Sequence, residues 1–211
     1  MADPIFNVSL AAFIGVAVAH LLAAISPGPS FVLSVRTAAN EGFRTAAGLA
    51  FGFGLGATIW AAGALLGLKL IFEILPWLFT AIKIAGGLFL CFIAWGMWRH
   101  ATDPLPPITP GHAPQSTPRA IRLGLAAMLA NPKPAIFFGG VFVGLVPRDA
   151  NAADLGLILF NILWIETLWY VMTASLFSRA AARKVYARWK TACDRTFGAM
   201  LAALGLGVAA T

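Results

Sequence analysis

The chain has 211 residues, of which 60% are hydrophobic and only 11% are charged, with a net charge of +7. About a quarter of the residues in a soluble domain are charged, so this composition excludes an ordinary soluble protein. The hydrophobic residues stand in long blocks, which predicts an all-α, polytopic membrane protein and excludes a β-barrel of short alternating strands. The cations cluster between the blocks, which favours the lipid bilayer and not nucleic acid as the partner of the positive charge.

Six blocks are each long enough for a bilayer, which needs about 20 residues per helix. In chain order they are 5–28, 46–71, 77–98, 120–146, 155–177 and 193–211. Asp3 is the only charge before the first block, so we expect a retained span and not a cleaved signal peptide. Residues 100–118 hold six of the thirteen prolines and predict an extended linker. The expected organisation is a three-helix repeat (1–99), a Pro-rich cytoplasmic linker (100–118) and a second three-helix repeat (119–211).

Lysine and arginine predict the orientation, because cytoplasmic loops of membrane proteins are enriched in both. Two of these residues, Lys69 and Arg148, fall on one side of the six predicted spans. Eleven fall on the other side: Arg36, Arg44, Arg99, Arg119, Arg122, Arg179, Arg183, Lys184, Arg188, Lys190 and Arg195. The side with more lysine and arginine residues should be cytoplasmic. Both termini then face outward if all six blocks cross, whereas the N-terminus lies inside if the first block turns back at its prolines.

A double-proline motif interrupts the first and the fourth block. The first copy reads S-P-G-P at 26–29 and the second reads N-P-K-P at 131–134. A proline inside a helix costs about 3 kcal/mol, because it lacks the N–H and clashes with the preceding turn. Each copy lies in the first of three blocks, and three crossings put the two halves in opposite orientations. This pattern is typical of two inverted repeats whose broken helices meet near the middle of the membrane.

Such breaks can bind a solute. Irregular backbone survives at membrane depth only when it is buried in protein or lines a wet cavity. The N-terminus of a half-helix can hold a carboxylate, and freed carbonyls can hold an ammonium group. The predicted substrate-binding residues are therefore Ser26, Pro27, Gly28, Pro29, Ser30, Asn131, Pro132, Lys133 and Pro134. The alternative is that both motifs are structural kinks.

With these paired motifs, a basic segment before the last helix and six predicted spans, the whole chain resembles the LysE/RhtB family of bacterial amino-acid exporters. The resemblance implies a multi-pass protein of the bacterial inner membrane that exports amino acids or related metabolites. It further implies coupling to protons and no organic cofactor. The chain departs from the family pattern at Ala57, where many relatives have an aspartate, and at Ser30 and Pro134. The missing acid weakens any inference that the substrate is lysine or arginine.

Glu166 is the one carboxylate placed well inside a predicted span, so it should be paired or protonated. We predict that Glu166 and His20 couple transport to protons, with a structural pair and a packing histidine as the respective alternatives. Lys133 could hold a substrate carboxylate or serve as the counter-ion of Glu166.

Other functions find less support in the sequence. A divalent metal-ion exporter is the main alternative, but it would need several convergent Asp, Glu, His or Met ligands. An enzyme would need an oriented nucleophile and base, and only Ser26 with His20 is available. Cys91 and Cys193 stand apart and predict no disulfide or metal site. The small-residue face formed by Gly48, Gly52 and Gly56 should pack inside the protein, with the broken first helix as one candidate partner, and would also allow a homodimer.

Overall fold

A computed structural model describes residues 7–74, 76–105, 114–142, 145–146 and 150–210, and all regular structure in these ranges is helical. This confirms the predicted all-α class. The elements are α1 (Leu10–Ile25), α2 (Pro29–Glu41), α3 (Phe43–Ile74), α4 (Pro76–Arg99), α5 (Thr117–Ala130), α6 (Pro132–Ile136), the π-helix η1 (Phe137–Phe142), α8 (Ala152–Phe177) and α9 (Ala180–Ala210).

Three of these helices are long and apolar enough to cross a membrane: α3 over Phe43–Gly67, α8 and α9. The helices α1 and α2 qualify together as a fourth span, bent by 62° at the break between them. The described apolar part of α4, Ile84–Arg99, is shorter. The described residues thus provide three or four candidate spans, and the six-span inverted repeat stays a prediction.

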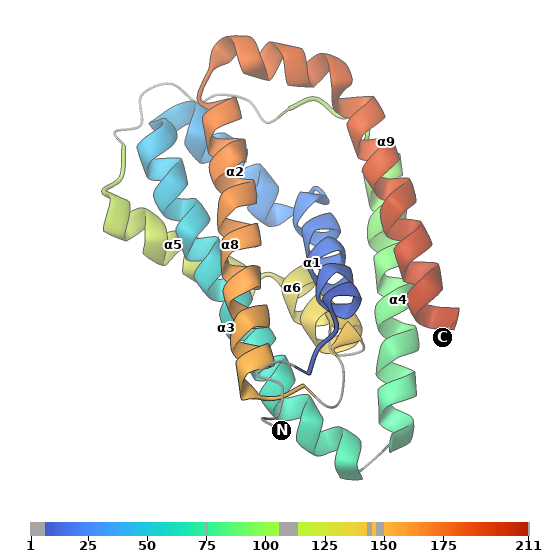
Figure 1. Cartoon of the computed structure of the whole chain (residues 1–211). Helices are drawn as coiled ribbons and strands as arrows, with labels where there is room; N and C mark the ends of the chain where they lie inside the picture. The colour runs from blue at the N-terminus through green and yellow to red at the C-terminus, as the bar shows by residue number, and fades with distance from the viewer. Residues whose placement is uncertain (1–6, 75, 106–113, 143–144, 147–149, 211) are drawn as a thin grey trace.

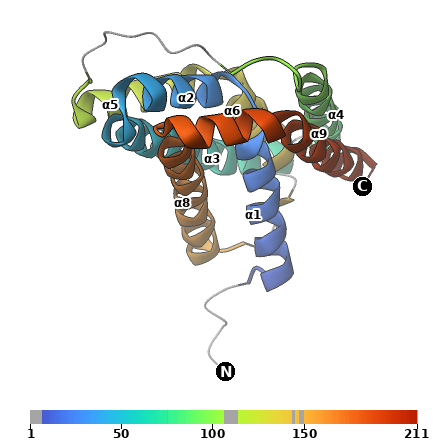
Figure 2. The same ribbon diagram turned by 90° about the horizontal axis from the view of Figure 1, so that it is seen from above.

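The helices form two groups with the broken segments between them (Figures 1 and 2). In one group α3 packs extensively against α5 and α8, and in the other α4 packs along α9. The helix α1 and the α6–η1 segment lie between the groups, where η1 contacts α4 and α1 contacts α8. Both interrupted segments therefore pack against helices from other parts of the chain, and Ser26 and Asn131 at the breaks are buried.

The first proline motif bends the chain without reversing it. Ser9 caps α1 by accepting a hydrogen bond from the Ala12 N–H at 3.2 Å, and the helix ends at Ile25. Gly28 is fully extended, and Pro29 opens α2 at a first-turn position where its missing N–H costs nothing. The predicted block ended at 28, but the chain continues as a helix to Glu41, where Gly42 turns it into α3 with a φ of 85°.

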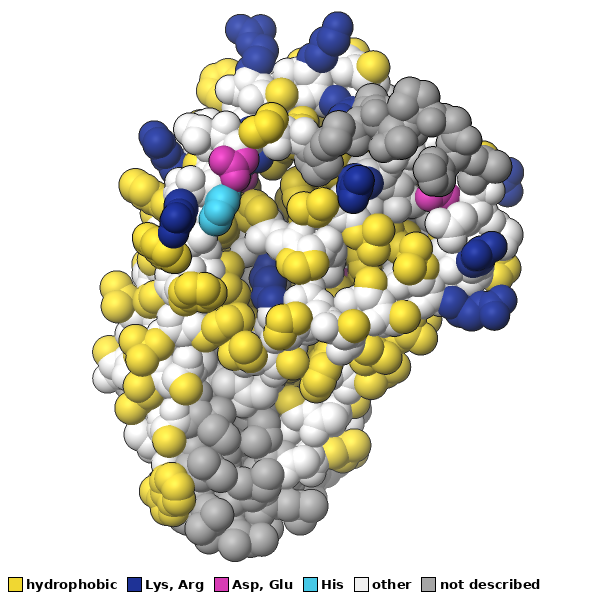
Figure 3. Space-filling view, turned by 180° about the vertical axis from the view of Figure 1, so that it is seen from behind, with side chains coloured by type: hydrophobic (Ala, Val, Ile, Leu, Met, Phe, Trp, Pro, Cys, Tyr) yellow, Lys and Arg dark blue, Asp and Glu magenta, His cyan; other side chains and the backbone are white. Residues whose placement is uncertain are grey.

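The start of the described chain lies at the end of the molecule opposite the cations. The backbone N–H groups of Asn7 and Val8 donate to the Asp154 carboxylate at 3.1 and 3.2 Å, at the beginning of α8. The other end of α8 leads into the arginine-rich start of α9, and Lys and Arg side chains gather toward that end in Figure 3.

The second proline motif ends α5 at Ala130. The side chain of Asn131 accepts a hydrogen bond from the Lys133 N–H at 3.0 Å and so caps the short helix α6, which continues as the π-helix η1. The interruption predicted at 131–134 is therefore present, and the predicted block 120–146 begins three residues later than α5 does.

The helix that contains the last predicted span begins before the predicted block does. The basic segment 179–190 lies between the fifth and the sixth predicted block, but α9 begins at Ala180 and continues to Ala210. Asp194, near the start of the predicted block, is buried and forms an i,i+4 ion pair with Lys190 at 2.8 Å. The first turns of α9 cross the end of the molecule before the helix descends beside α4 (Figure 1).

The glycine face of α3 packs internally, as expected, but its partner is α5 and not the broken first helix. A Cβ atom built on Gly52 would lie 2.2 Å from the Ile121 carbonyl oxygen, and one on Gly56 would lie 2.6 Å from the Met128 Cβ. Glycine at these positions lets two backbones approach closely, as in other membrane helix pairs. This contact holds the start of the fourth predicted block against the second.

Gly52→Ala should lower the thermal unfolding temperature of the detergent-solubilised protein by several degrees. The added methyl group must push apart two backbones, and overpacking of this kind costs about 1–3 kcal/mol. Gly63→Ala on the same helix is the matched control, because nothing lies within 4 Å of its Cβ position. Circular dichroism on heating compares the two variants, and equal transitions would contradict the α3–α5 packing.

Candidate functional site

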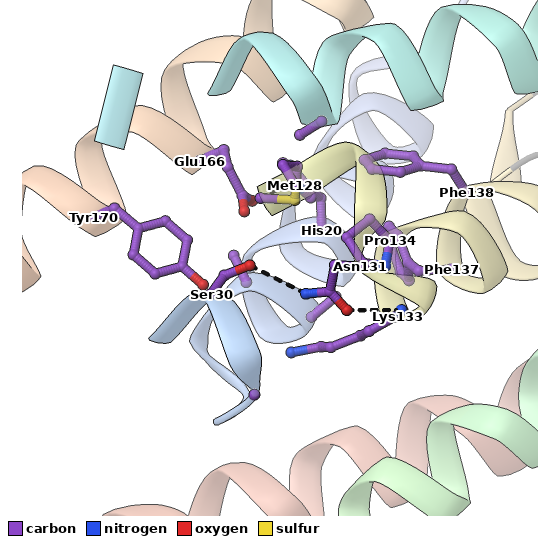
Figure 4. Close-up of a pocket in the computed structure, with 14 residues that line it drawn as sticks. His20, Ser30, Met128, Asn131, Lys133, Pro134, Phe137, Phe138, Glu166 and Tyr170 are labelled. Atoms are coloured by element: carbon purple, nitrogen blue, oxygen red, sulfur yellow. Dashed lines mark hydrogen bonds and ion pairs between the residues drawn. The ribbon is translucent and has the colours of Figure 1, made fainter. Parts of the chain in front are cut away.

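A small pocket lies where the two proline breaks meet (Figure 4). Its volume is about 30 Å³, which is enough for roughly one water molecule. Residues from both halves of the chain line it: His20, Ala23, Ala24, Gly28, Ser30, Ala57, Met128, Asn131, Lys133, Pro134, Phe137, Phe138, Glu166 and Tyr170.

The pocket gathers most of the residues singled out in the sequence. Seven of them line it: His20, Gly28, Ser30, Asn131, Lys133, Pro134 and Glu166. Ser26, Pro27, Pro29 and Pro132 are not among the lining residues. The three prolines act on the backbone beside the pocket, and Ser26 contributes its carbonyl group to a contact across it.

Two hydrogen bonds join the breaks directly. The Lys133 Nζ donates to the Ser26 carbonyl oxygen at 2.6 Å, and the Asn131 Nδ2 donates to the Ser30 Oγ at 3.1 Å. Both bonds connect residues more than 100 positions apart, and Asn131 and Ser30 are buried. The polar residues of one motif therefore satisfy backbone and side-chain groups of the other.

The prolines leave carbonyl groups without their usual donors, and the neighbouring elements replace some of them. In an unbroken helix, residue 132 would donate to the Met128 carbonyl, but Pro132 has no N–H. The Trp60 Nε1 and the Asn131 backbone N–H donate to this carbonyl instead, each at 3.3 Å. Pro27 and Pro29 likewise cannot donate to the carbonyls of residues 23 and 25.

The helices that begin after the two breaks, α2 and α6, differ in how their N-termini are capped. Asn131 caps α6 with its side chain, whereas no side chain caps α2, whose N-cap is Gly28. Gly28 and Ser30 face the pocket together with Lys133, whose Nζ would lie 3.7 Å from a Cβ on Gly28. The N-terminus of α2 carries partial positive charge, so this side of the pocket suits an anionic group.

The other side of the pocket holds a buried hydrogen bond between a side chain of α1 and one of α8. The His20 Nε2 and the Glu166 Oε2 are 2.9 Å apart, and their side chains are 2% and 6% exposed. The rings of Phe137 and Phe138 lie 6.1 and 5.6 Å from the His20 ring, measured between centroids. The structure therefore gives Glu166 a histidine partner, whereas Lys133 turns to the Ser26 carbonyl. Such a pair can exchange a proton between its members or with a solute.

Sequence reasoning missed several residues of the pocket. Tyr170 lies one turn after Glu166 on α8, and its hydroxyl points toward Ser30 in Figure 4. The i,i+4 spacing from Glu166 was the available signal. Met128, Phe137 and Phe138 flank the second motif, but apolar residues near a motif in an apolar block give no signal of their own.

The described residues contain no cluster of side chains suited to bind a metal ion. No three His, Cys, Asp or Glu side chains among those residues come close enough to share an ion. His20 and Glu166 offer two donors to the central pocket, and the other polar lining groups are a lysine, an amide and hydroxyls.

Comparison with known proteins identifies close relatives. The family model described as LysE type translocator matches residues 21–211. The chain is 37% identical to a threonine efflux protein of Escherichia coli K12 over 92% of its own length and 95% of that protein. It is 36% identical to the threonine efflux protein of Salmonella typhi over the same shares, and 28% identical to an uncharacterized membrane protein of Haemophilus influenzae, covering 86% and 88% of the two chains. No solved structure gives a significant match.

His20→Ala should destabilise the fold by about 3 kcal/mol, because it leaves the Glu166 carboxylate buried without its partner. Adding Glu166→Gln to this variant should recover much of the loss, since a neutral amide needs no counter-ion. A double-mutant cycle of thermal unfolding in detergent measures the coupling between the two residues. Strictly additive effects would show that the pair contributes nothing to stability.

Proposed function

The chain belongs to the LysE type translocator family of membrane transporters. We propose that it exports a small neutral amino acid of the threonine type in exchange for protons. The observation that carries the proposal is the pocket between the two proline breaks. Its lining is largely apolar, but Lys133 lies on one side of it and Glu166 on the other. A zwitterionic amino acid presents the complementary pair of charges.

The substrate carboxylate would bind at the N-terminus of α2. That terminus has no side-chain cap, and Lys133 lies beside it. To reach the substrate, the Lys133 ammonium would exchange its bond to the Ser26 carbonyl for a bond to the carboxylate. Ser26 then offers a free carbonyl, and its hydroxyl has no hydrogen-bond partner among the described residues.

The substrate ammonium group would bind near Glu166, in competition with His20. When the substrate ammonium group binds the Glu166 carboxylate, the proton that Glu166 shares with His20 can leave. When the substrate departs, a proton can return to the pair. Histidine is the side chain whose charge changes most readily near neutral pH. The exchange makes binding of the proton and of the amino acid mutually exclusive, as proton antiport requires.

The side chain of the substrate should be uncharged. Ala57 is buried at the pocket wall and provides no carboxylate. Glu166 is already engaged by the substrate ammonium in this scheme, so a second cationic group would stay unpaired at membrane depth, at considerable cost. The hydroxyls of Ser30 and Tyr170 and the amide of Asn131 could hydrogen bond to a threonine-like hydroxyl.

Transport would follow from the inverted-repeat arrangement. A cavity for about one water molecule cannot hold an amino acid, so the helices around the pocket must separate to admit one. The bonds of Lys133 to Ser26 and of Asn131 to Ser30 join the two halves of the chain at the pocket. Breaking these bonds on one side at a time would give alternating access. The basic end of the molecule would face the cytoplasm in the bacterial inner membrane.

Purified protein in proteoliposomes should export threonine when a pH gradient is imposed. Lys133→Met should lower both this export and threonine counterflow by roughly tenfold or more, because a bond worth about 1.4 kcal/mol or more to the carboxylate is lost. Glu166→Gln should abolish the response to the pH gradient while some counterflow remains, since the amide cannot release a proton. Arg122→Gln, an exposed residue of α5, is the control. Wild-type export by both site variants would refute the proposed roles.

A second test concerns the charge of the substrate. In the same vesicles, excess unlabelled threonine, serine or homoserine should compete with labelled threonine, whereas lysine and arginine should not. The expected reason is the absence of a carboxylate at Ala57. Effective competition by lysine would contradict the proposed neutral specificity. Export of divalent metal ions without export of any amino acid would instead support the metal-exporter alternative.

A further inference from the structure

We propose that residues 180–191, the crossing segment of α9, bind the headgroups of anionic phospholipids and that this lipid contact influences the central pocket. The lipid-binding part of the proposal is independent of the transported substrate. Its consequence for export rests on the function proposed above.

The crossing segment has the orientation of an interfacial helix. It leaves the end of α8 and runs across the basic end of the molecule, transverse to α3, α4 and α8 (Figures 1 and 2). If those helices cross the bilayer, the segment lies near the plane of the cytoplasmic headgroups. Amphipathic helices in that plane combine basic residues with exposed apolar side chains.

The outward side of the segment has this combination. Lys184 and Arg188 are exposed and one turn apart, and neither forms an ion pair with a carboxylate among the described residues. Val185 and Trp189 are likewise one turn apart, with 59% and 64% of their surface exposed. Two adjacent cations attract phosphate groups, and the neighbouring valine and tryptophan suit the boundary between headgroups and acyl chains. An anionic phospholipid satisfies both requirements at once.

The inward side of the same segment contacts the helix that contributes to the pocket. The Tyr186 ring packs edge-on against Phe177 with 4.9 Å between centroids, and it lies 6.4 Å from the Phe31 ring of α2. Phe31 follows Ser30, whose hydroxyl accepts the hydrogen bond from Asn131. A shift of the crossing segment toward the membrane would therefore be transmitted to one of the two bonds that join the repeats.

The base of the segment is fixed. The Lys190 Nζ donates to the carbonyls of His100 and Ala101 at 2.9 and 3.2 Å and to the Asp194 carboxylate at 2.8 Å. These bonds tie the Lys190 end of the segment to the end of α4.

Native mass spectrometry of the full chain in detergent, with added phosphatidylglycerol or phosphatidylcholine, tests the lipid contact. The variant Lys184→Gln/Arg188→Gln should bind phosphatidylglycerol roughly tenfold more weakly than wild type, since each basic residue adds attraction to an anionic surface. Arg119→Gln/Arg122→Gln is the matched control, because it removes the same charge from two exposed residues of α5. Equal losses in both variants, or none in either, would overturn the proposal.

Proteoliposomes with and without phosphatidylglycerol test the consequence for export. Wild-type threonine efflux should depend on the anionic lipid, and the Lys184→Gln/Arg188→Gln variant should lose that dependence while it still exports. The same dependence in this variant as in wild type would refute the link to the pocket. Because lipid binding is measured without transport, absence of threonine efflux in wild type would count against the proposed function alone.

Discussion

The structure depends on how unsatisfied backbone groups are accommodated inside an apolar protein. Prolines in two blocks remove amide donors from helices that have no water to replace them. Each break therefore has to find its partners in other parts of the chain. The Lys133 ammonium reaches the Ser26 carbonyl, and the Trp60 indole reaches the Met128 carbonyl. This requirement draws the two breaks together and gathers polar groups around one pocket.

The same constraint explains why a site can exist there. A continuous helix would bury all its backbone groups in internal bonds and offer nothing to a solute. At the breaks, backbone groups are held by single side chains that can exchange partners. Asn131 caps one half-helix, while the other has no side-chain cap and faces Lys133. This asymmetry gives the pocket one side suited to a carboxylate, and the His20–Glu166 pair gives the other side a group that can carry a proton.

Close packing around the pocket keeps these groups in place. The glycines of α3 allow its backbone to touch that of α5, so that the segment leading to the second break sits directly against the helix that supplies Ala57. The helices α4 and α9 pack along each other in a similar way, where a Cβ atom on Gly87 would lie 2.5 Å from the Gly205 carbonyl oxygen. Small residues at both contacts permit close approach without a hydrophobic driving force between helices, which lipid removes.

The sequence by itself determined the all-helical membrane class, the position of both breaks and the identity of the titratable residues at them, because hydropathy, proline and buried charge are local signals. Only the tertiary structure decided which residues these groups contact at the pocket. His20 and Glu166 are 146 positions apart, and no spacing rule links them. Tyr170 and Phe138 line the pocket because α8 and η1 approach it, not because of their own sequence context. The helical start of α9 could not be predicted from the sequence either, because its residues are polar enough for a loop. In the structure, this part of α9 contacts Phe31, Phe177 and the end of α4.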